Sequence, residues 1–227
     1  MVLRRYTEFM AAAQQIAPDE LMNYRSLAPM PAWLMLRSRY LILPDESNQP
    51  QVLRSKVEPL PRAGLYRNYL EIADPQARLA KLMNATFDSR VMVVLESAPD
   101  PLPSVQKPEG SVRVTDNSSD EVEVEVETAH PAILLLTDNY SKDWKVTAMP
   151  DSAARQYKLL PANHTQQAIA LSAGKHHFRL RYVPMGYVVG KWISALAVLG
   201  YAAWVVLHRM FCARAIPRSA CQPLSHP

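Results

Sequence analysis

The sequence predicts an α+β fold with three parts: a helical and strand–helix–strand N-terminal part, a small antiparallel β-sandwich, and one C-terminal transmembrane helix. Three patterns carry this prediction. Apolar residues recur at helical spacing near the N-terminus, alternate with polar residues after residue 110, and form an almost uninterrupted run over residues 188–207. With 227 residues and 48% apolar content, the chain can bury one or two ordinary domains in addition to an anchor.

Residues 1–60 are predicted to be mainly helical and to lead into a strand. Thr7 is a candidate cap for a first helix, and Asp19 is a candidate cap for a second. The apolar residues 33–36 then indicate a short helix, and residues 40–43 indicate a strand that Pro44 ends.

Residues 61–98 are predicted to form a strand–helix–strand unit. A first strand region carries the apolar residues Leu65, Tyr66, Tyr69, Leu70 and Ile72. Asp74 and Pro75 then begin a helix, because proline costs nothing at the first helical position. Residues 91–95 form a short buried strand. The four prolines within residues 99–110 make that segment a stiff linker and the best candidate for a domain boundary.

Residues 111–184 are predicted to form the β-sandwich. Residues 121–127 alternate valine with glutamate, which is typical of a strand with one buried face. Residues 132–136 are apolar on both faces and therefore belong in the centre of a sheet. In the last strand, Arg179 and Arg181 share the polar face, where they can pair with the glutamates of the acidic strand. Several short strands separated by close turns favour a sandwich.

Residues 187–207 are predicted to span a membrane, with a tail at 208–227. At about 1.5 Å per residue, the run is long enough to cross a hydrocarbon core of about 30 Å. Side chains that suit the membrane–water interface flank it: Tyr187, Lys191, Trp192, Trp204 and Arg209. The alternative is a buried core helix. Cationic residues lie on both sides of the run, so the charge pattern does not set its orientation.

Composition excludes several classes of partner and site. The net charge of +4 is mild, and no block of basic and aromatic residues indicates a nucleic-acid surface. Cys212 and Cys221 both follow the predicted span, which excludes a disulfide framework or a thiolate metal site from the N-terminal region. His176 and His177 point to opposite faces of a strand, so they cannot chelate one metal together. We expect no metal, no cofactor and no catalytic residue in this chain.

A group of three residues is the candidate ligand site. The rings of Tyr140 and Trp144 could stack on a sugar, with the carboxylate of Asp138 beside them. The alternative is structural: Trp144 fills the core of the sandwich, as large aromatic residues do in such folds. Asp138 and Asp143 form a pair of carboxylates on a turn, with no obvious cation or base partner in the sequence, so we expect them to cap the turn rather than to act as acid and base.

Four segments, in order, resemble the C-terminal part of the YfhO family of bacterial polytopic membrane proteins. The best match is the segment from Asp138 to Trp144, which looks like that family's acidic-x-Tyr-x-x-Gly-Trp signature, although Asp143 replaces the glycine. A second runs from residue 173 through the last strand to Pro184 and into the apolar helix. A third covers residues 87–96, and a fourth covers residues 36–42.

The resemblance implies a function that the residues alone do not. Members of the family look like GT-C-type glycosyltransferases, with a final extracytoplasmic domain before the last span. This chain would then be the membrane-anchored C-terminal portion of such a protein, with its bulk extracytoplasmic and its tail cytoplasmic. Its partners would be the lipid bilayer, upstream transmembrane helices of the same protein, and a glycan or cell-envelope polymer. The domain would cap the membrane core or position a glycan acceptor.

A second hypothesis needs no catalytic partner. The first ten residues include Arg4 and Arg5 but no apolar segment of the kind found in a signal peptide. Under this alternative the chain is a single-span binding or structural module at the cell envelope.

Overall fold

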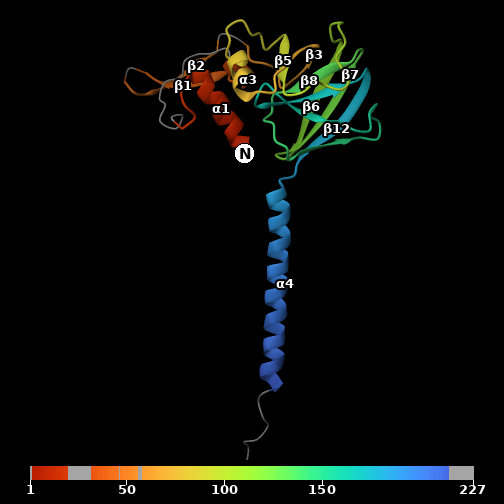
Figure 1. Ribbon diagram of the computed structural model, residues 1–227. Helices are drawn as coiled ribbons and strands as arrows, with labels where there is room; N and C mark the ends of the chain where they lie inside the picture. Colours follow the sequence, from red (N-terminus) through yellow and green to blue (C-terminus); the bar gives the residue numbers. More distant parts are fainter. Residues whose placement is uncertain (1, 20–31, 46, 56–57, 215–227) are drawn as a thin grey trace, which may run out of the picture. The chain divides into compact units, whose positions relative to one another are not determined.

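The computed structural model describes residues 2–19, 32–45, 47–55 and 58–214 (Figure 1). The chain forms two compact units, Met1–Tyr182 and Val183–Pro227. The first unit contains all the strands, and the second contains one long helix. The predicted α+β class, with its sandwich and its single C-terminal apolar helix, is confirmed.

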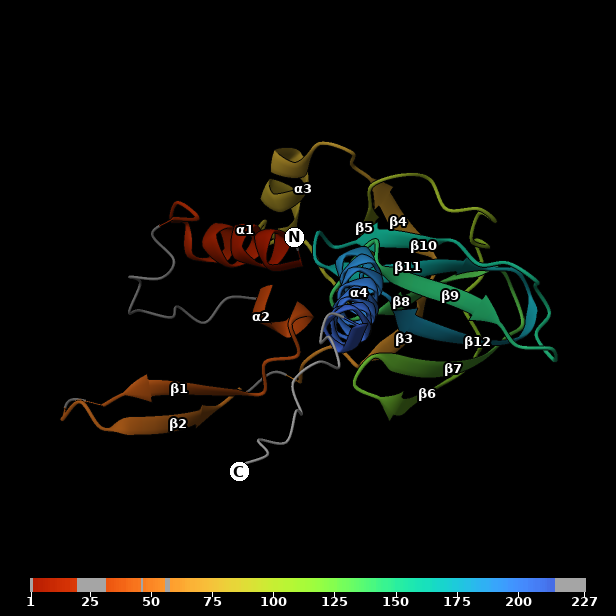
Figure 2. The ribbon, with the colours of Figure 1, turned by 90° about the horizontal axis from the view of Figure 1, so that it is seen from below.

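The larger sheet has six strands and a mixed pattern of pairing. The order across this sheet is β3 (Ala63–Tyr66), β8 (Ala132–Leu136), β11 (Gln166–Leu171), β10 (Leu159–Ala162), β5 (Met92–Leu95) and β4 (Asn68–Glu71) (Figure 2). Only the β4–β5 pair is parallel. The helix α3 (Pro75–Leu82) connects these two strands, as a parallel pair requires.

The strand–helix–strand prediction holds for its second half and needs correction for its first. The apolar region 65–72 was expected to be one strand region, but it forms β3 and β4, which lie at opposite edges of the sheet. Arg67 separates the two strands, and its guanidinium donates to the carbonyl of Val105 at 2.8 Å. At the start of α3, the Asp74 side chain accepts a hydrogen bond from the Ala77 amide, as an N-cap does.

The smaller sheet is fully antiparallel and has four strands. Its order is β6 (Gly110–Ser118), β7 (Glu121–Thr128), β12 (Gly174–Tyr182) and β9 (Trp144–Ala148). The predicted lateral pairing of the acidic and basic strands is confirmed, because Arg179 lies opposite Glu123 and Arg181 lies opposite Glu121. Arg179 forms ion pairs with Glu121 and Glu123 at 3.3 and 3.5 Å.

The two sheets pack face to face around one core. Its buried residues are Val122, Val124, Val126, Leu134, Leu136, Ile169, Leu171, Phe178 and Leu180. At about 25 cal/mol per Å² of apolar surface, burial of this kind is the main stabilising contribution to a sandwich. The sandwich also includes β3, β4 and β5, which precede the proline-rich segment. That segment is therefore not a domain boundary: the strands on either side of it belong to one compact unit.

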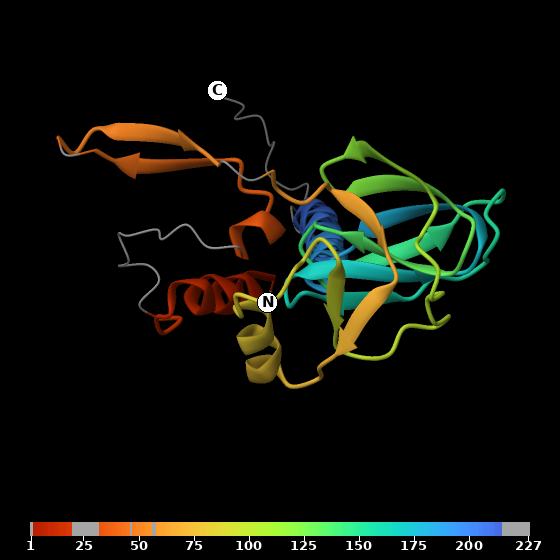
Figure 3. The same ribbon diagram turned by 90° about the horizontal axis from the view of Figure 1, so that it is seen from above.

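The proline-rich segment instead runs along the larger sheet. The Ser104 amide donates to the Pro131 carbonyl at 2.7 Å, just before β8 begins. A second buried cluster occupies the face of the larger sheet that points away from the core between the sheets; it includes Ile133, Leu135 and Ala168. Viewed from above, the connection between β5 and β6 passes over this side of the molecule (Figure 3).

Three helices gather beside β5 and β4 (Figures 2 and 3). The helices α1 (Val2–Gln14), α2 (Ala32–Met35) and α3 share a third cluster with β5, which includes Phe9, Met35, Leu82 and Val94. Thr7 was expected to cap the first helix, but α1 begins at Val2 and Thr7 lies inside it. The second predicted helix, beginning at Asp19, falls mostly outside the described residues.

The predicted short helix and strand before residue 45 are confirmed as α2 and β1 (Tyr40–Pro44). The sequence did not predict the partner of β1, which is β2 (Pro50–Arg54). The two strands form a separate antiparallel hairpin, with Ile42 opposite Val52.

The second unit is the helix α4 (Met185–Arg214). Within the described residues, Met185–Met210 is the one helix that is long and apolar enough to cross a membrane. Its most apolar window is 0% buried, as expected of a membrane span rather than of a core helix. The predicted interface residues lie on this helix with exposed side chains, including Tyr187, Trp192 and Trp204. Lys191 lies over the Trp192 ring, 6.0 Å from its centroid.

Candidate functional site

A groove of about 710 Å³ lies at one end of the sandwich. The larger sheet contributes Arg62, just before β3, and Asp138, just after β8. The smaller sheet contributes Asp116 from the end of β6 and the rings of Trp144 and Tyr182. The groove therefore forms where strand ends from the two sheets meet, and it brings together residues from five parts of the sequence.

Arg62 bridges the two sheets across this groove. Its Nη1 donates to Asp116 Oδ2 at 2.6 Å, and its Nε donates to Asp138 Oδ2 at 3.1 Å. The hydrogen bond to Asp116 raises the pKa of Arg62, and the same bond lowers the pKa of Asp116. Both groups therefore remain ionised at neutral pH. The ion pair with Arg62 gives Asp138 a cationic partner that the sequence did not indicate.

Trp144 and Tyr182 form the aromatic part of the groove. They are directly opposite residues on the antiparallel strands β9 and β12, so their side chains lie on the same face. Their ring centroids are 5.4 Å apart with an interplanar angle of 57°. Both rings are partly exposed, and Trp144 also packs against the core between the sheets. The structural and ligand-binding interpretations of Trp144 are thus compatible.

Tyr140 lies apart from the other two predicted glycan-facing residues. Its amide donates to the Thr165 carbonyl at 2.7 Å, and the Arg5 guanidinium lies 5.2 Å from its ring centroid. The structure therefore brings Asp138 and Trp144 into one groove and directs Tyr140 toward α1. The sequence did not predict Arg62, Asp116 or Tyr182 as site residues, because 54 and 76 residues separate Arg62 from its two partners.

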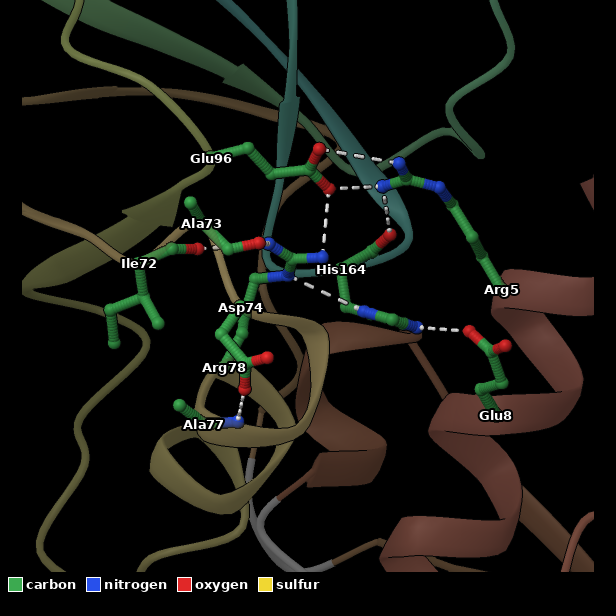
Figure 4. A network of polar contacts seen from close by, with 9 residues as sticks. All are labelled: Arg5, Glu8, Ile72, Ala73, Asp74, Ala77, Arg78, Glu96 and His164. Carbon is green, nitrogen blue, oxygen red and sulfur yellow. Dashed lines mark hydrogen bonds and ion pairs between the residues drawn. The ribbon is translucent and has the colours of Figure 1, made fainter.

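A second polar cluster joins the helices to the sheet (Figure 4). Arg78 is 2% exposed, and its Nη2 lies 2.9 Å from Glu96 Oε1. Its Nη1 donates to the carbonyls of Ile72 and Ala73. Arg5 pairs with the same carboxylate from α1, and its Nη1 also donates to the His164 carbonyl at 3.1 Å. One carboxylate just after β5 thus pairs with arginines from two helices.

His164 occupies the β10–β11 turn at the centre of this cluster. Its Nδ1 lies 3.4 Å from Arg78 Nε, which is a donor, so Nδ1 accepts and Nε2 carries the proton. Nε2 then donates to Glu8 Oε2 at 3.0 Å. Burial lowers the pKa of His164, and the nearby positive charge of Arg78 lowers it further. His164 is therefore neutral at pH 7.

This polar cluster fixes α1 and α3 to the sheet. A pocket of about 560 Å³ opens beside it, lined by Arg5, Glu8, Arg78 and His164. Arg5 and Arg78 pair with Glu96, and Glu8 pairs with Arg4 and His164. His164 has an arginine on one ring nitrogen and a glutamate on the other, so both of its hydrogen-bonding positions are occupied.

His176 and His177 point to opposite faces of β12, as predicted. His176 is buried, and its Nδ1 lies 2.8 Å from the Tyr157 hydroxyl. His177 lies on the outer face, where the potential ligand atoms of Glu123, Glu125 and His177 lie within 4.8 Å of one another. Glu123 also pairs with Arg179 and accepts from Asn117. These contacts make the group a ladder of charges across neighbouring strands.

Comparison with known proteins adds no assignment. No family model matches the chain, and searches of curated proteins and of solved structures found no match either.

Proposed function

We propose that this chain is a membrane-anchored domain that binds a glycan in the groove between Arg62 and Trp144. The observation that carries the proposal is the Trp144–Tyr182 pair beside two ionised carboxylates. Aromatic rings offer a flat apolar surface to a sugar ring, and carboxylates accept hydrogen bonds from its hydroxyl groups. Ser118, Ser119 and Asn139 supply further polar groups at the rim.

The groove is suited to binding rather than to chemistry. A general acid at neutral pH needs a raised pKa, whereas the Arg62 hydrogen bond lowers the pKa of Asp116. Arg62 also holds Asp138 in place from the other side. We therefore propose that the domain positions an acceptor glycan, or caps the membrane core, as the extracytoplasmic C-terminal part of a YfhO-like glycosyltransferase. The four sequence segments that resemble that family support this part of the proposal.

A single-span binding module at the cell envelope is the second candidate. The groove and the single apolar helix are the features that this candidate uses. The two candidates predict different upstream gene sequences, because a YfhO-like protein requires further apolar spans encoded before Met1.

Glycan binding can be measured on the full chain in nanodiscs by isothermal titration calorimetry against a panel of neutral and charged tetrasaccharides. We expect Trp144→Ala and Tyr182→Ala each to weaken binding about tenfold, because each removes one face of the aromatic pair. Tyr40→Ala is the matched control, since Tyr40 is an exposed tyrosine of the separate β1–β2 hairpin.

Trp144 also packs on the core, so its alanine variant needs a measure of folding. Trp144→Phe retains an aromatic side chain there, and the unfolding midpoint of each variant reports whether the sandwich is intact. Binding by wild type that persists in folded Trp144→Ala and Tyr182→Ala would contradict the proposal, as would the absence of binding to any glycan in the panel.

A further inference from the structure

The charged side chains that line the groove carry more negative than positive charge. Arg62 supplies one positive charge, and Asp116 and Asp138 supply two negative charges. Arg37 is a second cation that acts on Asp116, but its side chain is exposed and forms no ion pair with Asp116 among the described residues. One negative charge is therefore left uncompensated within the lining of the groove.

The aspartates also retain hydrogen-bonding capacity. Each uses Oδ2 to accept from Arg62, and within the described part of the chain no hydrogen bond occupies the other oxygen of either carboxylate. The Asp116 side chain is 60% exposed and that of Asp138 is 31% exposed, so a ligand can reach both. An ionised carboxylate prefers a charged donor, because charge-assisted hydrogen bonds are about twice as strong as neutral ones.

The Trp144–Tyr182 pair also favours a positively charged ligand group. The faces of tryptophan and tyrosine rings carry partial negative charge and attract cations within about 6 Å. A protonated amine on a sugar could contact a ring face and a free carboxylate oxygen at once. A carboxylate or phosphate on a sugar would instead face the surplus negative charge.

We infer that the groove selects an amino sugar with a free, protonated amine over the corresponding uncharged or acidic sugar. This inference rests on the proposed function and narrows its ligand class. Asp116 and Asp138 would hold the amine, and Trp144 with Tyr182 would hold the apolar face of the ring.

Three probes test this selectivity on the full chain in nanodiscs of zwitterionic lipid, with empty nanodiscs as the blank. They are a glucosamine tetramer, the N-acetylglucosamine tetramer and a galacturonate tetramer, titrated at mildly acidic pH where the free amines are protonated. We expect the glucosamine tetramer to bind about fivefold more tightly than its N-acetylated counterpart, as one unscreened charge contact near the surface implies. The preference should shrink in high salt.

Asp116→Asn removes the surplus charge while leaving the shape of the groove and the Arg62–Asp138 pair. We expect the preference for the amine to fall to about twofold or less in this variant. Glu71→Gln is the control, because it removes one exposed carboxylate from β4, outside the groove lining. It should keep the wild-type preference.

Different results would contradict the selectivity for an amine and the glycan binding itself. If the N-acetylated or the acidic tetramer binds as tightly as the amine, or if Asp116→Asn retains the preference, the inference is wrong while glycan binding stands. If none of the three tetramers binds, the proposed function itself fails.

Discussion

At the scale of single residues, His164 is the clearest example of a side chain whose charge state the fold controls. The imidazole is buried in the β10–β11 turn, where Glu8 faces one ring nitrogen and Arg78 faces the other, and Arg5 donates to the His164 carbonyl. Protonation would place a third positive charge beside the two arginines. The folded state therefore favours neutral His164, and its pKa lies below the ordinary value of 6.5.

This arrangement predicts a loss of stability in acid. The unfolded chain takes up a proton at His164 as the pH falls through 6.5, whereas the folded chain takes it up only at lower pH. The free energy of unfolding contributed by His164 is thus fully present above pH 6.5 and declines as the pH falls below it. We expect the thermal unfolding midpoint of wild type to drop over this range relative to that of His164→Gln.

The Glu8 carboxylate provides a check on this prediction. Burial opposes its ionisation, but the hydrogen bonds from Arg4 and His164 outweigh burial and lower its pKa below the ordinary 4.5. The stability contributed by Glu8 is therefore lost only below pH 4.5, at lower pH than the loss due to His164. The pKa of His177 is raised by its hydrogen bonds to Glu123 and Asp151, so its contribution to stability increases as the pH falls through the same range. The test of His164 is therefore the difference between the two proteins: a midpoint that changes equally from pH 7 to pH 5 in wild type and in His164→Gln would contradict the assignment.

The residues of the groove show what sequence can and cannot predict at this scale. Asp138 and Trp144 were recognisable because a carboxylate and an aromatic ring lie six residues apart in one segment. Arg62 and Asp116 carried no such local signal. Only the pairing of β3 with β8, and the packing of one sheet on the other, brings them together.

At the scale of elements, the helices depend on the sheet through a few charged contacts. Arg78 on α3 and Arg5 on α1 both pair with Glu96, which follows β5. Arg78 also satisfies the backbone carbonyls of Ile72 and Ala73 in the connection that leads from β4 to α3. Removing this side chain would leave a cavity, and the Ile72 and Ala73 carbonyls and the Glu96 carboxylate would lose the hydrogen bonds or ion pair that Arg78 provides.

We therefore expect Arg78→Ala to reduce the free energy of unfolding by about 3 kcal/mol, a cost typical of breaking a buried ion pair by removing one partner. Denaturant unfolding of the detergent-solubilised chain, followed by near-ultraviolet circular dichroism, measures the change. Arg113→Ala is the control, because Arg113 is an exposed arginine of β6, and it should alter stability by less than about 0.5 kcal/mol. Equal effects of the two substitutions would show that the Arg78 contacts do not hold the helices.

Periodicity predicted the type of several elements but not their partners. The valine–glutamate alternation of β7 and the Asp74–Pro75 start of α3 gave correct elements, because local spacing and capping determine both. The region 65–72 was wrongly predicted as one strand region, because its apolar pattern continues on both sides of Arg67. In the structure the chain moves there from one edge of the sheet to the other. Strand order depends on long-range pairing, which a single sequence does not display.

At the scale of the whole molecule, the chain consists of a β-sandwich unit with packed helices and one long apolar helix. The proline-rich segment was expected to divide the first unit, because its composition is that of a linker. Composition did not reveal that the strands before and after it pair within one sheet. The apolar run, by contrast, was predictable from the sequence alone, because length and hydrophobicity are local properties.

Alkaline carbonate extraction of membranes from cells expressing the full chain tests most directly whether α4 anchors the domain in lipid. A helix that spans the bilayer resists extraction, because its apolar side chains would have to enter water. We predict that the full chain stays in the membrane pellet and that a version ending at Tyr182 does not. Recovery of the full chain in the carbonate supernatant would contradict the membrane anchor and the glycan-positioning role proposed at the membrane.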